Sequence, residues 1–397
     1  IVAGAPGVES SRGSAYVFER TSMQEMLVLG TNGLVIANGA AANTAYGTDF
    51  GSLAWDGART NVFSITNIGG ETLTISSWTT NGAGAPAFVV LEMPISVSAN
   101  ASSNFTVIFA ATNIGSYTAQ VSIVNTGTNT PYLINLTGTV IKADQAPLQF
   151  SPASPQTYNT TNTLNVTGGA GAGGVVFEIV DGPGQIADMS NLWVLAGTGV
   201  ITVRVTKAAD TLYNAATATA LVVCARATQT IAVFPNPGDQ VTTNTVGLNV
   251  MASSGLPVSF NVLPPSPAVI AGGTNLSFTG AGAVSIAASQ AGDADWSPAA
   301  EVTNTFAVTK ADAQVTLNDL NQTYDGAERA VTATTVPPGL TVDITYNGGA
   351  PVPIAAGSYA VSGTVNNLIW QGAATGTLTV SKASQPIVFP NPGAQVT

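Results

Sequence analysis

Residues 383–397 read ASQPIVFPNPGAQVT, and residues 227–242 read ATQTIAVFPNPGDQVT. A long string that returns with one deletion and a few substitutions indicates tandem repetition. The earlier copy opens a repeat, so we expect residues 383–397 to be the first strand of a further repeat. The sequence therefore predicts an architecture of repeated modules rather than a specific activity.

A basic residue followed by alanine marks the start of each repeat. The junction words are Lys142-Ala-Asp-Gln, Arg226-Ala-Thr-Gln, Lys310-Ala-Asp-Ala and Lys382-Ala-Ser-Gln. The modules between them have roughly 70–85 residues, which is within the size range of autonomous domains. Two interpretations of the basic residue stay open: an exposed linker charge, or a side chain that fixes the angle between neighbouring domains.

The composition favours an all-β protein. The chain has 397 residues, of which 45% are hydrophobic and 8% are charged, and its net charge is −11. So few charges disfavour surface helices, which need a polar outer face, whereas Thr, Val and Gly in short alternating runs favour strands. The acidic balance argues against a nucleic-acid partner. No apolar run of about 18 residues occurs, so we expect no membrane-spanning helix.

Residues 1–24 carry the words Val2-Ala-Gly-Ala-Pro6 and Gly13-Ser-Ala-Tyr-Val-Phe18. These words resemble the FG-GAP propeller repeat, although the calcium loop of that family is missing. A single hairpin cannot close a propeller, which needs about four or more blades. We interpret residues 1–24 as a β-hairpin remnant of such a repeat.

Residues 25–141 alternate with period two, as in Phe63 with Ile65 and Phe105 with Val107. Such alternation is typical of strands with one buried face, and about seven strands with regular turns indicate a sandwich. The words Phe50-Gly-Ser-Leu53 and Gly115-Ser-Tyr117-Thr-Ala-Gln-Val resemble the choice-of-anchor D, or ASPM–SPD-2–Hydin, type of immunoglobulin-like domain. That resemblance implies a fold but no ligand.

Residues 142–226 and 227–310 resemble bacterial Ig-like repeats, through words such as ASSGLPVSFNV at 252–262. Residues 311–382 resemble an MBG-type module, and the matching words include Tyr324-Asp-Gly326 and Thr345-Tyr-Asn-Gly348. The predicted fold is all-β: tandem Ig-like β-sandwich domains forming an elongated rod.

The residue inventory disfavours catalysis. The chain has no histidine, which excludes Ser-His-Asp and Cys-His catalysis and any histidine metal site. The lone cysteine, Cys224, lies in an apolar run and is interpreted as a small core residue. We predict that the protein is not an enzyme and has no cofactor.

Two acidic residues form a weak calcium candidate. Asp293 and Asp295 flank Ala294 in a predicted turn. Calcium prefers about six to eight oxygen ligands, and only these two carboxylates are local. A plain turn capped by an aspartate is the alternative.

Three aromatic residues occupy similar late positions in their modules: Tyr213, Trp296 and Trp370. Aromatic side chains on a β-sandwich can stack sugars, which would make these positions ligand sites. Repetition in one frame favours the other interpretation, packing against the module's core or junction.

The C-terminal copy exposes apolar residues if nothing covers it: Ile387, Val388, Phe389 and Val396. Adding the strand to the open sheet edge of a neighbouring subunit would satisfy its backbone groups and bury these side chains. Head-to-tail contacts of this kind give filaments. In the alternative, the strand leads into the next repeat of the same chain.

These observations predict a non-enzymatic structural segment, a stalk or fibre, of a large secreted or cell-surface bacterial protein that serves adhesion or filament assembly. Its partners would be copies of itself, neighbouring repeats, or a glycan or cell-surface molecule. The alternative function is a carbohydrate- or cell-binding module that uses exposed aromatics.

Overall fold

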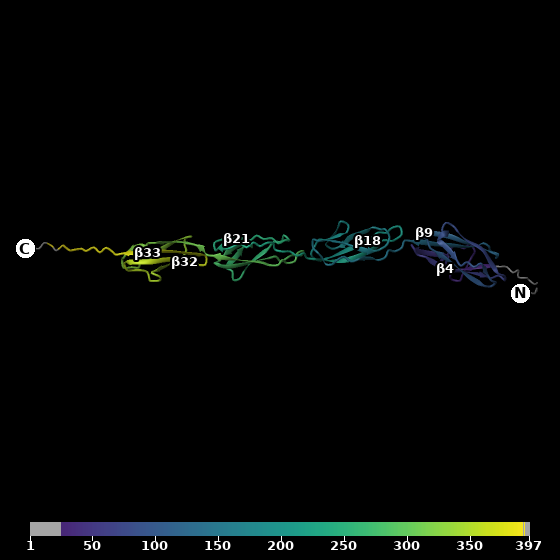
Figure 1. The fold of residues 1–397 in the computed structure, drawn as a ribbon, viewed down its shortest axis with the longest axis horizontal. Helices are drawn as coiled ribbons and strands as arrows, with labels where there is room; N and C mark the ends of the chain where they lie inside the picture. Colours follow the sequence, from purple (N-terminus) through teal and green to yellow (C-terminus); the bar gives the residue numbers. More distant parts are fainter. Residues whose placement is uncertain (1–24, 392, 394–397) are drawn as a thin grey trace, which may run out of the picture. The chain divides into compact units, whose positions relative to one another are not determined.

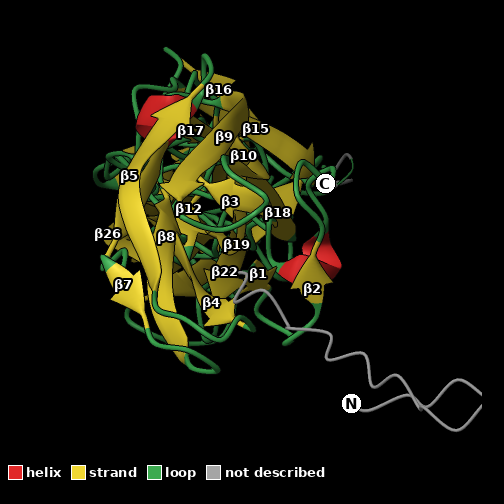
Figure 2. Cartoon of the chain, turned by 90° about the vertical axis from the view of Figure 1, so that its right-hand side faces the viewer, coloured by secondary structure: helices red, strands yellow, loops and turns green. Residues whose placement is uncertain are grey.

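The computed structural model describes residues 25–391 and 393. The FG-GAP-like words at 1–24 and the apolar Val396 lie outside the described residues. The described chain is all-β, as predicted: strands and loops make up almost all of it, with two short 3₁₀ turns (Figure 2).

The strand pairs form four successive sets, which follow one another along the colour gradient of Figure 1. We call them the first (β1–β10), second (β11–β19), third (β20–β26) and fourth (β27–β33) modules. By internal contacts the chain divides into two compact units. One holds residues 1–156, 160–195 and 199–223, and the other holds 157–159, 196–198 and 224–397.

The first module is a sandwich of two five-stranded sheets, ordered β2-β1-β4-β8-β6 and β3-β10-β9-β5-β7. Its elements are β1 (Met26–Leu29), β2 (Val35–Ile36), η1 (Thr44–Tyr46), β3 (Asp49–Ala54), β4 (Arg59–Asn67), β5 (Leu73–Asn81), η2 (Ala85–Ala87), β6 (Phe88–Leu91), β7 (Ser96–Val97), β8 (Ser102–Phe109), β9 (Gly115–Asn125) and β10 (Tyr132–Ile141). The alternation read from the sequence is confirmed, because Phe63, Ile65, Phe105 and Val107 are all buried.

One continuous aromatic core fills the first module. The ring of Phe109 stacks on Phe88, with centroids 4.8 Å apart, and is tilted against Phe50 at 5.8 Å. Gly138 on β10 faces this ring, because a Cβ there would lie 2.4 Å from a Phe109 ring carbon. The close approach of β10 to the ring therefore requires glycine at this position.

The second module has a four-stranded sheet, β12-β19-β18-β15, with smaller sheets β13-β17-β16 and β11-β14. Its strands are β11 (Leu148–Phe150), β12 (Gln156–Thr157), β13 (Thr161–Thr163), β14 (Val166–Gly168), β15 (Val175–Asp181), β16 (Gly184–Ala187), β17 (Asn191–Val194), β18 (Val200–Lys207) and β19 (Ala216–Ala225). Ile201, Val203 and Val205 of β18 point into the core. Cys224 is buried at the end of β19, as predicted, and its burial raises the pKa of the thiol.

The third module repeats this plan, with sheets β20-β26-β25-β22 and β21-β24-β23. Its strands are β20 (Gln240–Val241), β21 (Thr245–Gly247), β22 (Ser259–Leu263), β23 (Ala268–Ala271), β24 (Asn275–Phe278), β25 (Gly282–Ser289) and β26 (Val302–Thr309). Ile231 and Phe234, which belong to the repeated opening string, are buried in its core.

The fourth module has the sheet β27-β33-β32-β31, with β29 also paired to β33, and the separate pair β28-β30. Its strands are β27 (Ala311–Asp312), β28 (Gln314–Asn318), β29 (Asn321–Thr323), β30 (Thr332–Val336), β31 (Asp343–Tyr346), β32 (Gly357–Asn366) and β33 (Trp370–Ser381). Its buried residues fall into two small clusters, one around Leu378 and Val361 and one around Val315 and Val365.

Candidate functional site

A short turn of the same kind ends at the predicted aromatic residue in all three repeated modules. We call residues 210–213, 293–296 and 367–370 the junction turns. Each begins with Asp or Asn and ends, three residues later, with Tyr213, Trp296 or Trp370. The spacing is visible in the sequence, but its meaning follows only from the hydrogen bonds.

The first side chain of each junction turn caps the turn. The Oδ1 of Asp293 accepts the backbone N–H groups of Asp295 and Trp296, both at 2.8 Å. In the second module, Asp210 Oδ1 accepts the N–H groups two and three residues later, both at 2.8 Å. In the fourth, Asn367 Oδ1 accepts the equivalent N–H groups at 2.9 and 2.6 Å. A side-chain oxygen that accepts backbone donors two and three residues later is a usual stabiliser of turns.

The alanine after each junction basic residue pairs with the turn of its own module. The N–H groups of Ala143, Ala227 and Ala311 donate to the carbonyls of Leu212, Asp295 and Ile369, each at 2.9 Å. These alanines form parallel bridges to the three predicted aromatics. Tyr213, Trp296 and Trp370 are therefore brought to one structural position, the start of a module.

The basic residues also donate to the junction turns or, in one case, to the residue directly before the turn. Lys142 Nζ donates to the Asp210 carbonyl, Arg226 Nε to the Ala294 carbonyl at 3.4 Å, and Lys310 Nζ to Asn366 Oδ1. Lys142 and Arg226 thus attach the linker to the turn of the module that they open, and Lys310 attaches it to the residue before the turn. A role in fixing the angle between domains stays a prediction.

The turn carboxylate in the second module has a second set of donors. Asp210 Oδ2 accepts the N–H of Ala172 at 2.6 Å, in addition to the two bonds within the turn. The donated N–H groups of Leu212, Tyr213 and Ala172, with a smaller contribution from Lys142, lower the pKa of Asp210.

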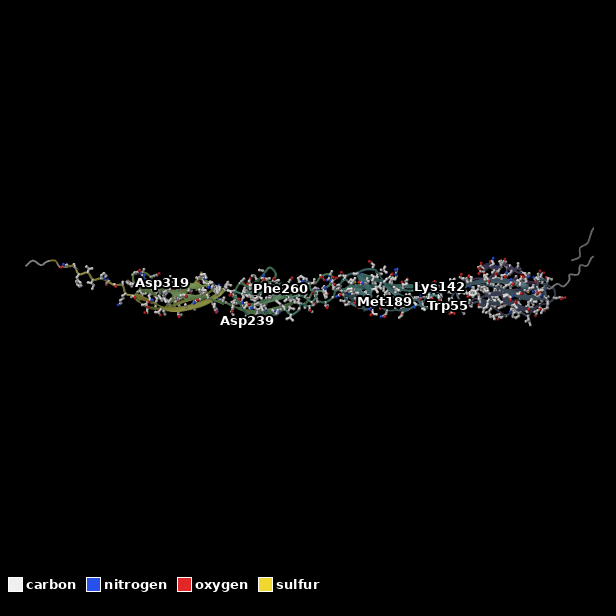
Figure 3. The ribbon with its side chains drawn as sticks, turned by 90° about the horizontal axis from the view of Figure 1, so that it is seen from above. Trp55, Lys142, Met189, Asp239, Phe260 and Asp319 are labelled. Carbon is white, nitrogen blue, oxygen red and sulfur yellow. The ribbon has the colours of Figure 1, made fainter. Side chains whose placement is uncertain are left out.

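In two of the three junction turns, the aromatic residue contacts an aromatic side chain of the preceding module. Trp55, which is labelled in Figure 3, meets Tyr213 edge-to-face with ring centroids 5.5 Å apart, within the first unit. Tyr158 meets Trp296 in the same way at 5.7 Å, within the second unit. Such pairs contribute about 0.5–1.5 kcal/mol of stability beyond the contribution of the apolar area that they bury.

The third turn has a hydroxyl in place of the aromatic contact. Thr242 Oγ1 donates to the Ile369 carbonyl at 2.6 Å and accepts the N–H of Ala311 at 3.1 Å. Trp370 packs instead beside its own module's cluster of Ala313, Val315 and Val365.

The glutamine of the junction word is a functional residue that the sequence reasoning missed. Gln145 donates to the carbonyl of Asn214 at 2.7 Å, and Gln229 donates to that of Ser297 at 2.8 Å. Both acceptors directly follow the junction aromatic. The recurrence of Gln in three of the four junction words was the available signal.

Both members of the calcium candidate already accept hydrogen bonds. Asp293 Oδ1 holds its own turn, and Asp295 Oδ1 accepts the N–H of Gly197 at 2.8 Å. Within residues 25–391 and 393, no three acidic or cysteine side chains are grouped as a metal site would require. The calcium site stays a prediction.

Three of the four apolar residues predicted for strand donation lie in the described part of the chain, and these three are exposed. Ile387, Val388 and Phe389 are 78%, 81% and 85% exposed, whereas the equivalent Ile231 and Phe234 are 8% and 7% exposed in the third module. The repeated string therefore has two environments in one chain.

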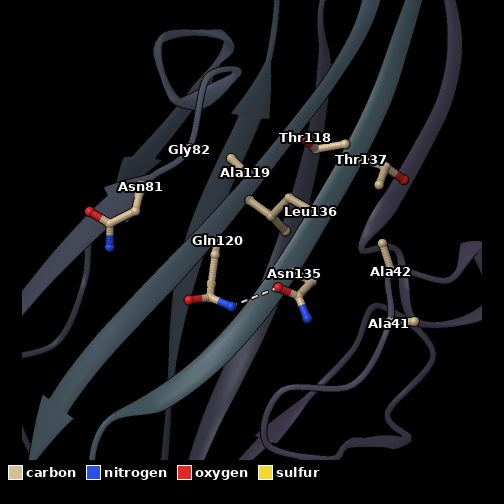
Figure 4. Close-up of a pocket in the computed structure, with 10 residues that line it drawn as sticks. All are labelled: Ala41, Ala42, Asn81, Gly82, Thr118, Ala119, Gln120, Asn135, Leu136 and Thr137. Carbon is tan, nitrogen blue, oxygen red and sulfur yellow. Dashed lines mark hydrogen bonds between the residues drawn. The ribbon is translucent and has the colours of Figure 1, made fainter.

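An open groove of about 550 Å³ lies on the outer face of β5, β9 and β10 in the first module (Figure 4). Asn81, Gln120 and Asn135 are paired across these three strands and form a row of amides. Gln120 donates to Asn135 Oδ1 at 2.9 Å, and Asn135 in turn donates to the carbonyls of Gly39 and Ala40. The lining carries no charge.

One module of the chain matches a known family model. Residues 313–384 match the MBG domain family. No curated protein matches the chain.

Among solved structures, three multi-domain chains are similar at low identity. Sidekick-1 immunoglobulin domains 1–5 are 15% identical, covering 84% of this chain and 79% of that one, with a TM-score of 0.26. Drosophila N-cadherin EC1-4 is 10% identical (75% and 92% covered, TM-score 0.21). Domains 1–6 of surface layer protein SbsC are 13% identical (82% and 53% covered, TM-score 0.22). In the described part of the chain, no helix is long and apolar enough to cross a membrane.

Proposed function

We propose that the chain is a non-enzymatic structural segment, a stalk or fibre, of a large bacterial protein that is secreted or held at the cell surface. Its work would be to carry or connect, in adhesion or in an extracellular filament. The observation that carries this proposal is the junction turn. Three modules make the same capping bonds and the same alanine bond at the position where one module follows another.

The surroundings of the junction aromatics support packing rather than sugar stacking. Tyr213 and Trp296 each present an edge-to-face contact to another ring, and Trp370 packs beside an apolar cluster. A sugar platform needs an open ring face. All three side chains are only partly exposed.

The test replaces one junction aromatic in the full chain. Trp296→Ala should destabilise the third module while leaving glycan-array binding unchanged. Trp78→Ala is the matched control, because Trp78 is 41% exposed on β5 and does not belong to a junction turn. Loss of glycan binding with stability intact in Trp296→Ala would overturn the structural assignment in favour of a binding module.

The amide groove of the first module supports the second candidate, carbohydrate or cell-surface binding, at a different place from the aromatics. Uncharged amides and hydroxyls that converge on an open groove suit a neutral, hydroxyl-rich ligand. Gln120→Ala should then reduce glycan-array binding without changing hydrogen exchange in the core of the first module. Equal binding by the variant and the parent chain would remove this candidate.

The module boundaries at 141/142, 226/227, 310/311 and 382/383 are also proposals. If each module has its own core, residues 311–382 expressed alone should unfold cooperatively and give a β-type circular dichroism spectrum. A disordered product would contradict the boundaries.

We propose further that the segment with Ile387, Val388, Phe389 and Val396 completes a sheet, either in a second copy of the chain or in a following repeat. The support is the burial of Ile231 and Phe234 in the equivalent string. Deleting residues 384–397 and imaging the product by electron microscopy separates the two. Filaments that persist after the deletion would exclude donation by this strand.

A further inference from the structure

In the third and fourth modules, the segment that opens the module runs parallel to that module's last strand. In the fourth module, β27 pairs with the first residues of β33 and β29 pairs with its last residues, both in parallel. In the third, Ala227 bridges Trp296 in parallel and β20 pairs in parallel with the end of β26. The opening segment therefore pairs with the chain at the junction turn, before or at the start of the last strand, and again at the end of that strand.

Backbone hydrogen bonds close this pairing at equivalent positions in all three modules. At the far end, the N–H groups of Tyr158, Thr242 and Tyr324 donate to the carbonyls of Ala225, Thr309 and Ser381, at 2.8, 2.9 and 2.8 Å. At the near end are the alanine bonds of 2.9 Å described above. We call the two sets together the terminal clasp.

The direction of the pairing decides whether tension on the chain ends breaks the hydrogen bonds of the clasp together or one after another. The chain enters the fourth module just before β27 and leaves it just after β33, so tension on the two ends draws β29 and β33 past each other along their common axis. Bonds between strands that slide in this way are strained together and must break together. Bonds of a hairpin pulled at its open end break one after another.

We propose that the terminal clasp gives the repeated modules resistance to unfolding under end-to-end tension. The inference rests on the proposed function as a connecting segment, since only a connector is pulled by its ends. The junction turn and its basic residue extend the clasp, because they attach the first residues of the module to the start of the last strand. Resistance to a pull is a property of the unfolding rate rather than of the equilibrium.

A directional force-clamp measurement on the full chain tests the proposal. Two pairs of introduced, exposed cysteines serve as attachment points for the pulling handles, in a Cys224→Ala background that removes the native cysteine. Both pairs pull on the same folded fourth module. Thr309→Cys with Lys382→Cys pulls along the clasp. Ser358→Cys with Lys382→Cys pulls apart the open end of the β32–β33 hairpin, where Ser358 is paired with Thr379. At equal force, we expect unfolding along the clasp to be at least about tenfold slower, the equivalent of about 1.4 kcal/mol.

One backbone bond can be removed without touching the rest of the module. Tyr324→Pro deletes the N–H that donates to Ser381, and the extended residue before it in β29 tolerates a following proline. Tyr324→Ala keeps the N–H and is the matched control. We expect Tyr324→Pro to unfold about three- to tenfold faster along the clasp. The hairpin direction should stay unchanged in both variants, which also shows that they are folded.

Equal unfolding rates in the two directions, or an unchanged rate along the clasp in Tyr324→Pro, would overturn the proposal. This failure is distinct from failure of the proposed function. Glycan binding through Trp296 or the amide groove would refute the connecting role and leave the directional ratio untouched. Equal rates would leave a connector that does not resist tension.

Discussion

The junction turn at Asp293 and the junction turn at Asn367 make the same backbone bonds in different surroundings. In the third module the fourth residue of the junction word is Gln229, whose side-chain amide is buried. Its Nε2 donates to Gln290 Oε1 at 2.9 Å and to the Ser297 carbonyl at 2.8 Å, and its Oε1 accepts the Ser254 hydroxyl. In the fourth module the same position of the junction word is Ala313, which packs with Val315 and Val365.

The difference shows that the turn tolerates two kinds of support. A polar network and an apolar cluster both hold the start of the last strand, because the turn itself satisfies its own backbone donors through Asp or Asn. Buried polar networks are sensitive to partial loss, since each remaining group is left without its partner. Apolar packing loses only the contact that is removed. The third and fourth modules should therefore respond differently to substitutions at equivalent positions.

The largest effect is expected at Gln229. Gln229→Ala would remove three side-chain hydrogen bonds of a buried amide, to Gln290, Ser297 and Ser254, and should lower the free energy of unfolding by about 2–3 kcal/mol. Gln145→Ala is the control, because Gln145 occupies the same position with its side chain only partly buried and should cost less. Hydrogen exchange in the full chain, read over residues 227–309, measures the change. A larger loss in Gln145→Ala would contradict the network argument.

A smaller and more even effect is expected in the turns themselves. Asp293→Ala and Asn367→Ala each remove an oxygen that accepts two N–H groups. By analogy with helix caps, each should cost about 1–2 kcal/mol. Asp293→Asn keeps the accepting oxygen and should cost little. If Asp293→Asn is as damaging as Asp293→Ala, charge rather than turn capping holds the third module, and the likeness to Asn367 is lost.

The charge of the turn residue gives a still smaller, pH-dependent difference. The pKa of Asp210 is lowered by the donated N–H groups, so the stabilisation belongs to the ionised form. It is complete above the ordinary aspartate pKa of about 3.9 and is lost as the pH falls through the lower pKa of the folded protein. The second module should therefore lose protection in acid, measured by hydrogen exchange at residues 143–225. Asp210→Asn should flatten this part of the profile, and a profile that stays equally steep would assign the loss to other carboxylates.

Much of the fold could be predicted from local patterns, because strands with one buried face repeat with period two. Phe105, Val107 and the opening string with Ile231 and Phe234 are buried as those patterns indicate. The repeat frame also placed Tyr213, Trp296 and Trp370 at one structural position. What supports each aromatic could not be predicted. Thr242 and Ile369, like Trp55 and Tyr213, are far apart in sequence and meet only through the fold.

The candidate sites divide in the same way. The spacing from Asp or Asn to the aromatic was present in the sequence, yet the acids at 293 and 295 suggested a metal because a carboxylate in a turn fits either role. The hydrogen bonds supply the information that spacing lacks: which oxygen is already accepting, and from which backbone groups. The amide row of Asn81, Gln120 and Asn135 had no linear signal at all, since it depends on strand register.

The smallest expected effect concerns calcium at Asp293 and Asp295. In each carboxylate one oxygen already accepts backbone N–H groups, so a cation would have to share or replace those bonds. Calcium also needs about six to eight oxygens, and a turn that begins with Asn367 does without a charge at the equivalent position. We therefore expect neither EDTA nor millimolar calcium to move the melting temperature of the full chain, with the second and fourth modules as internal references. A calcium-dependent rise that disappears in Asp295→Asn would make the third module a metal-stabilised junction. It would then differ from the fourth in chemistry as well as in packing.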